Sequence, residues 1–113
     1  MRILVCGGRD YNDWDTVHKA LEMFRSSGKN TLICGMAKGA DSLGLRWAEL
    51  YGYEVEKYYP DWNKYGKSAG FRRNSDMLNL GKPDVVVAFP GGKGTAMMVD
   101  IARKAGVKVI EVN

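Results

Sequence analysis

The sequence predicts an α/β fold in which a five-stranded, mostly parallel sheet lies between two layers of helices. Short runs rich in Val, Ile and Leu alternate with segments whose apolar residues recur at helical spacing, and the connections between them are short. Glycines directly follow several of the apolar runs. Strands that alternate with helices form parallel sheets covered on both faces, joined by right-handed crossovers. We therefore expect a three-layer, Rossmann-like sandwich with the strand order 3-2-1-4-5.

The size and composition of the chain are those of an ordinary globular protein. Its 113 residues fall within the usual range of one domain, and we expect residues 1–113 to form a single domain. An apolar share of 45% and a charged share of 27% exclude disordered, collagen-like and coiled-coil chains. No apolar run approaches the length of a membrane helix, and the first residues lack the pattern of a signal peptide. We expect a cytoplasmic protein with no membrane partner.

The chain begins with a strand, a helix and a second strand. Residues 2–6 are an apolar run typical of a buried parallel strand. Asn12 or Asp13 is a suitable N-cap for a helix over residues 14–24, where apolar side chains recur at helical spacing. Residues 31–34 form another short apolar run, which predicts the second strand.

A second helix and an edge strand come next. Asp41 or Ser42 can cap a helix that ends near Gly52. Residues 53–59 alternate polar and apolar side chains, as expected for a strand at the edge of the sheet. Residues 60–70 show no regular pattern, so we expect an irregular segment there that is both aromatic and polar.

The last part of the chain predicts two further helices and two further strands. Residues 71–80 have helical spacing and end at a glycine and a proline. Residues 85–89 are a continuous apolar run, which predicts the fourth strand. Residues 96–105 suit a buried helix, and residues 107–112 predict the fifth strand.

A glycine loop between the fourth strand and the last helix carries the strongest functional pattern. The loop consists of Gly91, Gly92, Lys93, Gly94 and Thr95. Glycines let the backbone approach a ligand closely, and the unpaired N–H groups at a helix start favour anions. Thr95 can cap the helix or contact a phosphate. The alternative is a glycine-rich turn before a packed helix, because the spacing fits neither the dinucleotide fingerprint nor the P-loop.

Two other loops follow the first and second strands and carry further candidate residues. They are Gly7, Gly8, Arg9 and Asp10 in the first loop, and Gly35, Lys38, Gly39 and Asp41 in the second. Ligands of such sheets bind beyond the carboxyl ends of the strands, where the strand order reverses. With the first strand central, we expect residues 7–11 and 90–95 to face each other across one crevice, with residues 35–41 as its wall.

The charged residues of these loops have a functional and a structural interpretation. Arg9 can bind a phosphate or carboxylate with two hydrogen bonds, and Asp10 can accept hydrogen bonds from a ribose or act as a base. Alternatively, the two side chains brace neighbouring loops as ion pairs. Asp41 is more often a helix cap than a catalytic acid in such a position. Arg72 and Arg73 point about 100° apart on a helix, so at most one of them faces the crevice.

The remaining candidates concern stacking, packing and charge. Trp62 and Tyr65 either stack on a base or seal the core or an interface. Cys6 and Cys34 are expected to be buried core residues, and His18 a structural residue. We expect no metal site and no cofactor.

The net charge of +4 matters less than the placement of the basic residues, which suits a phosphate-bearing ligand. The basic residues in or next to the candidate loops are Arg9, Lys38, Lys67, Arg72, Arg73 and Lys93.

With these residues in view, the chain resembles the SLOG superfamily of Rossmann-like nucleotide-binding domains, especially its small YspA-type members. The resemblance rests on GGRDY, GMAKGAD, DWNKYGKSAGFRRNSDM and AFPGGKGT, which occur in this order and cover nearly the whole chain. The superfamily also includes the LONELY GUY phosphoribohydrolases and the domain of DNA-processing protein A that binds single-stranded DNA. The resemblance implies the fold and a nucleotide-like ligand.

The resemblance argues against the phosphoribohydrolase mechanism. Those enzymes carry PGGxGTxxE, whose glutamate stabilises the cationic sugar, and here Met98 occupies that position. Their arginine in an RKxxM-like stretch matches Arg73. Asp10 or Asp41 would have to replace the glutamate if the protein were an enzyme, with Arg73 on the phosphate.

These observations favour a protein that binds a nucleotide, ADP-ribose or an NAD-derived signal as a sensor, carrier or sponge. The phosphate would lie on the glycine loop, with charge-assisted contacts from Arg9, Lys67 and Arg73. Asp10 or Asp41 would hold the ribose hydroxyl groups, and Trp62 or Tyr65 would stack on the base. The alternatives are an N-glycosidic hydrolase that acts on nucleotides and, less favoured, a single-stranded nucleic-acid binder. A homo-oligomer would form through helices, with Met97 or Trp47 in the contact.

Overall fold

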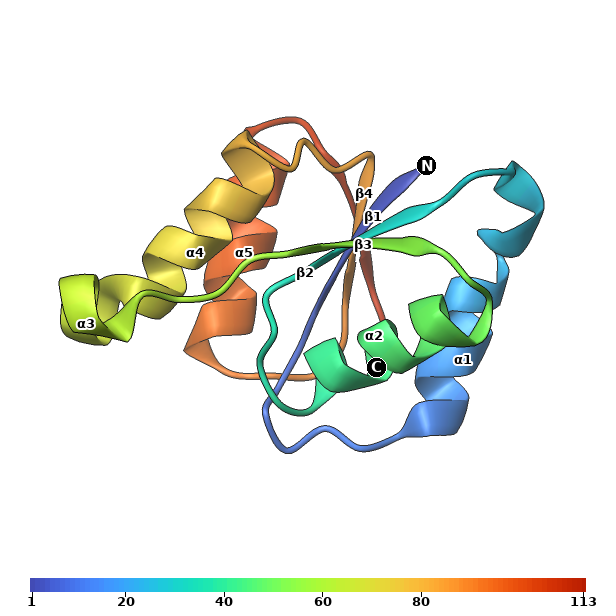
Figure 1. Ribbon diagram of the computed structural model, residues 1–113, viewed down its shortest axis with the longest axis horizontal. Helices are drawn as coiled ribbons and strands as arrows, with labels where there is room; N and C mark the ends of the chain where they lie inside the picture. Colours follow the sequence, from blue (N-terminus) through green and yellow to red (C-terminus); the bar gives the residue numbers. More distant parts are fainter.

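Five strands form one parallel sheet in the order β3-β2-β1-β4-β5 (Figure 1). The computed structural model describes the backbone of residues 1–113 and all side chains except that of Ser27. The strands are β1 (Arg2–Cys6), β2 (Thr31–Cys34), β3 (Glu54–Lys57), β4 (Val85–Ala88) and β5 (Lys108–Glu111). The predicted fold class and strand order are confirmed. The strand order reverses between β1 and β4, as the sequence predicted.

Helices cover both faces of this sheet. They are α1 (Trp14–Glu22), α2 (Ala40–Leu50), α3 (Trp62–Tyr65), α4 (Ala69–Asn79) and α5 (Lys93–Lys104), with short 3₁₀ turns η1 (Arg25–Ser27) and η2 (Gly66–Ser68). Figure 1 shows α1 and α2 on one face of the sheet and α4 and α5 on the other. No helix in the described chain has both the length and the apolar character needed to cross a membrane.

The alternation of side chains along β1 divides the core into two parts. Ile3 and Val5 pack with the α1 and α2 side chains, whereas Leu4 and Cys6 pack with those of α4 and α5. This is the arrangement expected of a central strand whose successive side chains point to opposite faces. Cys6 and Cys34 are buried and form no disulfide, as predicted. Of the two predicted subunit contacts, Trp47 is fully buried and so cannot touch another subunit, and contact through Met97 stays a prediction.

Tertiary contacts decide where α2 and α5 begin. Asp13 caps α1 as predicted and accepts a hydrogen bond from the Thr16 N–H at 3.1 Å. By contrast, the N-cap of α2 is Gly39, and the predicted cap Asp41 lies in the first turn. The N-cap of α5 is Gly92 and not Thr95. In both helices the chain turns at a glycine, so no side-chain cap is used.

The segment from residue 60 to residue 70 is more regular than predicted. Asp61 caps the short helix α3 and accepts a hydrogen bond from the Lys64 N–H at 3.1 Å. Gly66, with φ +54°, ends α3. The helix α4 then begins at Ala69, two residues before the predicted start at residue 71. Helices as short as α3 lack the apolar spacing from which longer helices are predicted.

Candidate functional site

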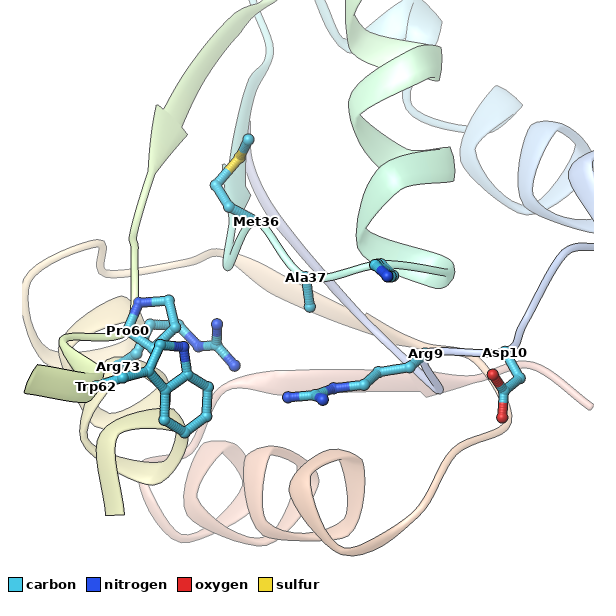
Figure 2. A pocket seen from close by; sticks show the side chains of 8 residues that line it. Arg9, Asp10, Met36, Ala37, Pro60, Trp62 and Arg73 are labelled. Atoms are coloured by element: carbon cyan, nitrogen blue, oxygen red, sulfur yellow. The ribbon is translucent and has the colours of Figure 1, made fainter. Parts of the chain in front are cut away.

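A cavity of about 430 Å³ opens near the carboxyl ends of β1 and β2 (Figure 2). Its lining comes from the β1–α1 loop, the β2–α2 loop, the chain that enters α3, and α4. The lining residues are Arg9, Asp10, Met36, Ala37, Lys38, Pro60, Trp62 and Arg73. We call this space the outer cavity.

A smaller inner cavity of about 80 Å³ shares Arg9, Ala37 and Arg73 with the outer cavity. Its other lining residues are Cys6, Gly7, Asp41, Asn74, Met77, Gly94 and Thr95. The inner cavity therefore reaches the first turn of α5, at the point where the strand order reverses. Such switch points are the usual ligand sites of open parallel sheets.

Arg9 is an exposed residue whose guanidinium extends across the outer cavity. In Figure 2 it points from the β1–α1 loop toward Trp62 and Arg73, while Asp10 lies at the opposite end. Neither Arg9 nor Asp10 forms an ion pair or a side-chain hydrogen bond with any residue whose side chain is described. The structural interpretation, in which the two side chains brace the loops as ion pairs, is therefore wrong. Arg9 is available to a ligand.

Arg73 presents a second guanidinium to both cavities. Its Nη1 donates to the Gly35 carbonyl, and its Nε donates to the Asn74 Oδ1 at 3.0 Å. Burial lowers the pKa of Arg73, whereas the nearby charge of Asp41 acts to raise it. An arginine side chain has five N–H donors. Arg73 is thus fixed in place by two of its donors, and others remain for a ligand.

Asp41 is a buried carboxyl group on the wall of the inner cavity. Only 7% of its surface is exposed, and its Oδ2 accepts a hydrogen bond from the Ala37 N–H at 3.1 Å. Burial raises the pKa of Asp41, although the hydrogen bond from Ala37 and the charge of Arg73 both act to lower it. The second oxygen has no hydrogen-bond partner within the described chain. Asp41 therefore combines a structural contact with a free acceptor.

Asn74 is a buried polar residue of this site that the sequence did not single out. Its side-chain amide donates to the Gly94 carbonyl at 3.2 Å, and its Oδ1 accepts from Arg73. It thereby links α4 to the first turn of α5 and orients the guanidinium. A signal was present, because Asn74 precedes Met77 and Leu78 by three and four residues and so shares their apolar helix face.

The first loop and the glycine loop touch each other directly. The Gly8 N–H donates to the Pro90 carbonyl at 2.8 Å, and the Gly8 carbonyl accepts from the Ala40 N–H at 3.1 Å. A Cβ on Gly91 would lie 2.7 Å from the Gly8 nitrogen, so only glycine fits there. The two loops thus touch at Gly8 and Pro90, and beyond this contact Gly7, Arg9, Gly94 and Thr95 line the inner cavity from opposite loops. Ala37 and Asp41 of the predicted wall line it as well, so the predicted crevice corresponds to the inner cavity.

The residues of the predicted glycine loop line two different cavities. Gly94 and Thr95 line the inner cavity, whereas Gly91 and Gly92 line a separate cavity of about 240 Å³ next to β5. Thr95 lines both. Lys93 is exposed and lines none of these three cavities. Within the glycine loop, only Gly94 and Thr95 are therefore placed to contact a ligand in the inner cavity.

Several predicted residues lie outside the two cavities. Lys67 is exposed on η2 and lines neither the outer nor the inner cavity. The Arg72 guanidinium lies 4.3 Å from the centre of the Tyr65 ring, so these two side chains pack together outside both cavities. Trp62, by contrast, lines the outer cavity with half of its surface exposed.

Comparison with known proteins adds two findings. Residues 1–65 match the model of the YspA, cpYpsA-related SLOG family, and this range contains Arg9, Asp41 and Trp62 but not Arg73. The chain is also similar to the Gene 61 protein of Mycobacterium phage D29, with 39% identity over 118 residues. That alignment covers 96% of this chain and 94% of the phage protein, and so includes nearly the whole fold.

Proposed function

Because the chain belongs to the YspA, cpYpsA-related SLOG family, we propose that it binds a phosphate-bearing, nucleotide-derived ligand in the outer and inner cavities. Membership of the family supports a nucleotide-related ligand in general. The candidates are a nucleoside monophosphate, ADP-ribose or another NAD-derived signal. The protein would act as a sensor, carrier or sponge for that ligand.

The observation that carries this proposal is the excess of unpaired positive charge in the outer cavity. Arg9, Lys38 and Arg73 line it, and none of them forms an ion pair with a described residue. The acidic groups nearby are Asp10 at the far end and Asp41, whose pKa is raised by burial. Two guanidinium groups that face one space favour a phosphate, because each can donate two parallel hydrogen bonds.

Two further features fit a nucleotide. The half-exposed indole of Trp62 lines the same cavity, and stacking of a base on an aromatic side chain contributes about 1–3 kcal/mol. Gly94 and Thr95 bring the first turn of α5 to the inner cavity, where the Thr95 hydroxyl and unpaired backbone N–H groups of the helix start can hydrogen-bond a polar group of the ligand. The outer and inner cavities together thus offer groups suited to a base, a sugar and a phosphate.

The first test is to incubate the purified protein with AMP, NAD, ADP-ribose and cyclic ADP-ribose, remove unbound ligand and identify what is released on denaturation by mass spectrometry. We expect one intact species to be retained. Titration calorimetry with that species should show that Arg9→Ala weakens binding about 10- to 100-fold, because hydrogen bonds to charged groups contribute about 1.5–3 kcal/mol.

A matched control is Lys93→Ala, which removes an exposed positive charge in the glycine loop but outside the cavities. This variant should bind nearly as tightly as the unmodified protein. If the Arg9→Ala variant bound the ligand as tightly as the unmodified protein, or if none of the four compounds were retained, the proposed function would be contradicted.

A second candidate function is hydrolysis of an N-glycosidic bond. Met98, which stands at the position of the phosphoribohydrolase glutamate, is a fully buried residue of α5 and lines neither the outer nor the inner cavity. Asp41 favours this function nevertheless, because its carboxyl group lines the inner cavity beside Arg73. Release of free base and ribose phosphate from AMP, abolished by Asp41→Asn, would establish an enzyme. Recovery of AMP intact after prolonged incubation would exclude that reaction.

A further inference from the structure

The inner cavity contains a free hydrogen-bond acceptor that the phosphate contacts do not use. One oxygen of Asp41 is occupied by the Ala37 N–H, and the other has no partner among the side chains and backbone groups described. The residue is only 7% exposed, and it lines the inner cavity. This oxygen is not among the buried unpaired side-chain atoms of the described residues, so it is open to the cavity. A group of the ligand that donates to it would gain a hydrogen bond to a carboxyl oxygen that no described protein group uses.

The surroundings of Asp41 define which kind of group fits. Arg73 lies close enough to influence the pKa of Asp41, yet the two side chains form no ion pair within 4.0 Å. Thr95 lines the same space. A ligand group between Asp41 and Arg73 has to donate to the first and accept from the second. Adjacent hydroxyl groups do both, since a hydroxyl is one donor and two acceptors.

A phosphate suits the inner cavity less well than hydroxyl groups. Its negative charges would lie against the Asp41 carboxyl group, and like charges at short range repel strongly in a buried site. In the outer cavity the Arg9 guanidinium extends away from Asp10 (Figure 2), and Lys38 lines the same space. The volume of about 80 Å³ also suits a few hydroxyl-sized groups, since one water needs about 10–15 Å³.

We propose that the inner cavity binds the vicinal hydroxyl groups of a ribose through Asp41 and Arg73, and that the protein therefore selects ribonucleotides over 2′-deoxyribonucleotides. The phosphate then lies in the outer cavity on Arg9 and Lys38. This inference rests on the proposed function, because it assigns the sugar of the nucleotide-derived ligand. It adds a specificity that membership of the family does not supply and names the carboxyl group responsible.

The test compares AMP with 2′-deoxy-AMP, and ADP-ribose with its 2′-deoxy analogue, by titration calorimetry. We expect the ribose form to bind at least about 10-fold more tightly, because a site that hydrogen-bonds a hydroxyl rejects the analogue that lacks it. Asp41→Asn keeps the shape and an acceptor for the Ala37 N–H, but it presents an amide donor to the cavity. The preference should then fall below about threefold.

Asp76→Asn is the control, because this exposed carboxylate on α4 lines neither cavity and should leave the preference unchanged. A second measurement needs no variant: the ¹³C carboxyl resonance of Asp41 should shift on addition of AMP and much less on addition of 2′-deoxy-AMP. Equal affinities for the two sugars would overturn this inference and leave the proposed function standing. Failure of both AMP and ADP-ribose to bind would overturn both.

Discussion

At the scale of single residues, burial decides which ionisable groups of the site can do chemistry. Asp41 and Arg73 are held in place by hydrogen bonds to the β2–α2 loop. Burial raises the pKa of Asp41 and lowers the pKa of Arg73, which favours the neutral form of each group. Arg9 is exposed and forms no ion pair within the described chain. The site thus combines two groups of fixed position with one that can adjust to a ligand.

Replacement of Asp41 by asparagine should stabilise the protein at neutral pH. Because the folded pKa of Asp41 lies above the ordinary value of 3.8, its contribution to stability is complete below that value and is lost as pH rises through the folded pKa. The asparagine side chain carries no charge and avoids this loss. We expect the Asp41→Asn variant to melt a few degrees higher at pH 7.5, with the difference shrinking toward pH 4. A variant that melts lower at pH 7.5 would contradict this explanation.

The buried thiols should react slowly in the folded protein. Burial raises the pKa of Cys6 to about 12 and that of Cys34 to about 11, so thiolate is scarce at pH 8. We expect iodoacetamide to label neither residue within an hour at pH 8, and to label both within minutes in guanidinium chloride, as followed by mass spectrometry. Fast labelling of Cys6 in the native protein would mean that the inner cavity exposes a reactive thiol.

At the scale of secondary structure elements, backbone contacts between loops define the site. The β1–α1 loop is held between the start of α2 and the chain that leaves β4 by the hydrogen bonds of Gly8 with Ala40 and Pro90. Gly39 packs against this loop with φ +75°. Such contacts place Arg9 over the cavity, so a change at Gly39 acts on the whole arrangement of loops.

Gly39→Ala should destabilise the protein strongly. The added Cβ would overlap the Gly8 carbonyl and lie 2.5 Å from the Arg9 carbonyl oxygen, in a backbone conformation that alanine rarely adopts. Strain and overpacking together should lower the free energy of unfolding by roughly 2–5 kcal/mol in urea titrations. Gly92→Ala is the matched control, because no atom lies within 4 Å of its added Cβ and φ is −100°. Similar stabilities of the two variants would refute the packing argument.

At the scale of the whole molecule, one sheet connects the two parts of the core. β1 is hydrogen-bonded to both β2 and β4, and its side chains supply both faces. Neither helical layer can lose its contacts without exposing the apolar side chains of this strand. The prediction that residues 1–113 form one domain leads to a further experiment.

Thermal unfolding should be a single cooperative transition. Circular dichroism at 222 nm reports the helices, and fluorescence of Trp47 reports the α1 and α2 side of the core, where this residue is fully buried. We expect the two signals to give the same midpoint. Different midpoints would show that the layers unfold separately. Trp14 and the exposed Trp62 also contribute to the fluorescence. The Trp62→Phe variant is the appropriate background, because it leaves Trp47 and Trp14, which both belong to the α1 and α2 side of the core.

The sequence by itself determined the fold class, the strand order and most of the elements. The apolar runs and helical spacings that predict them are local, and the short connections leave few topologies for a parallel sheet. It also identified Arg9, Asp41 and Trp62 as residues that line the cavities. Arg9 and Asp41 follow buried strands, and polar residues in such positions lie at the carboxyl edge of the sheet. The predictions of fold class and strand order succeeded because the local pattern agrees with the final fold, whereas ligand binding by Arg9, Asp41 and Trp62 stays a prediction.

Only the tertiary structure decided how the loops meet and which of their residues share a space. The contact of Gly8 with Pro90 divides the glycine loop between two cavities and leaves Gly91, Gly92 and Lys93 outside the inner one. The helical spacing places Asn74 on the apolar face of α4, but only the tertiary structure shows that its hydrogen bonds reach Arg73 and the first turn of α5. Such contacts depend on the distances between segments far apart in the chain, and these distances are set by packing.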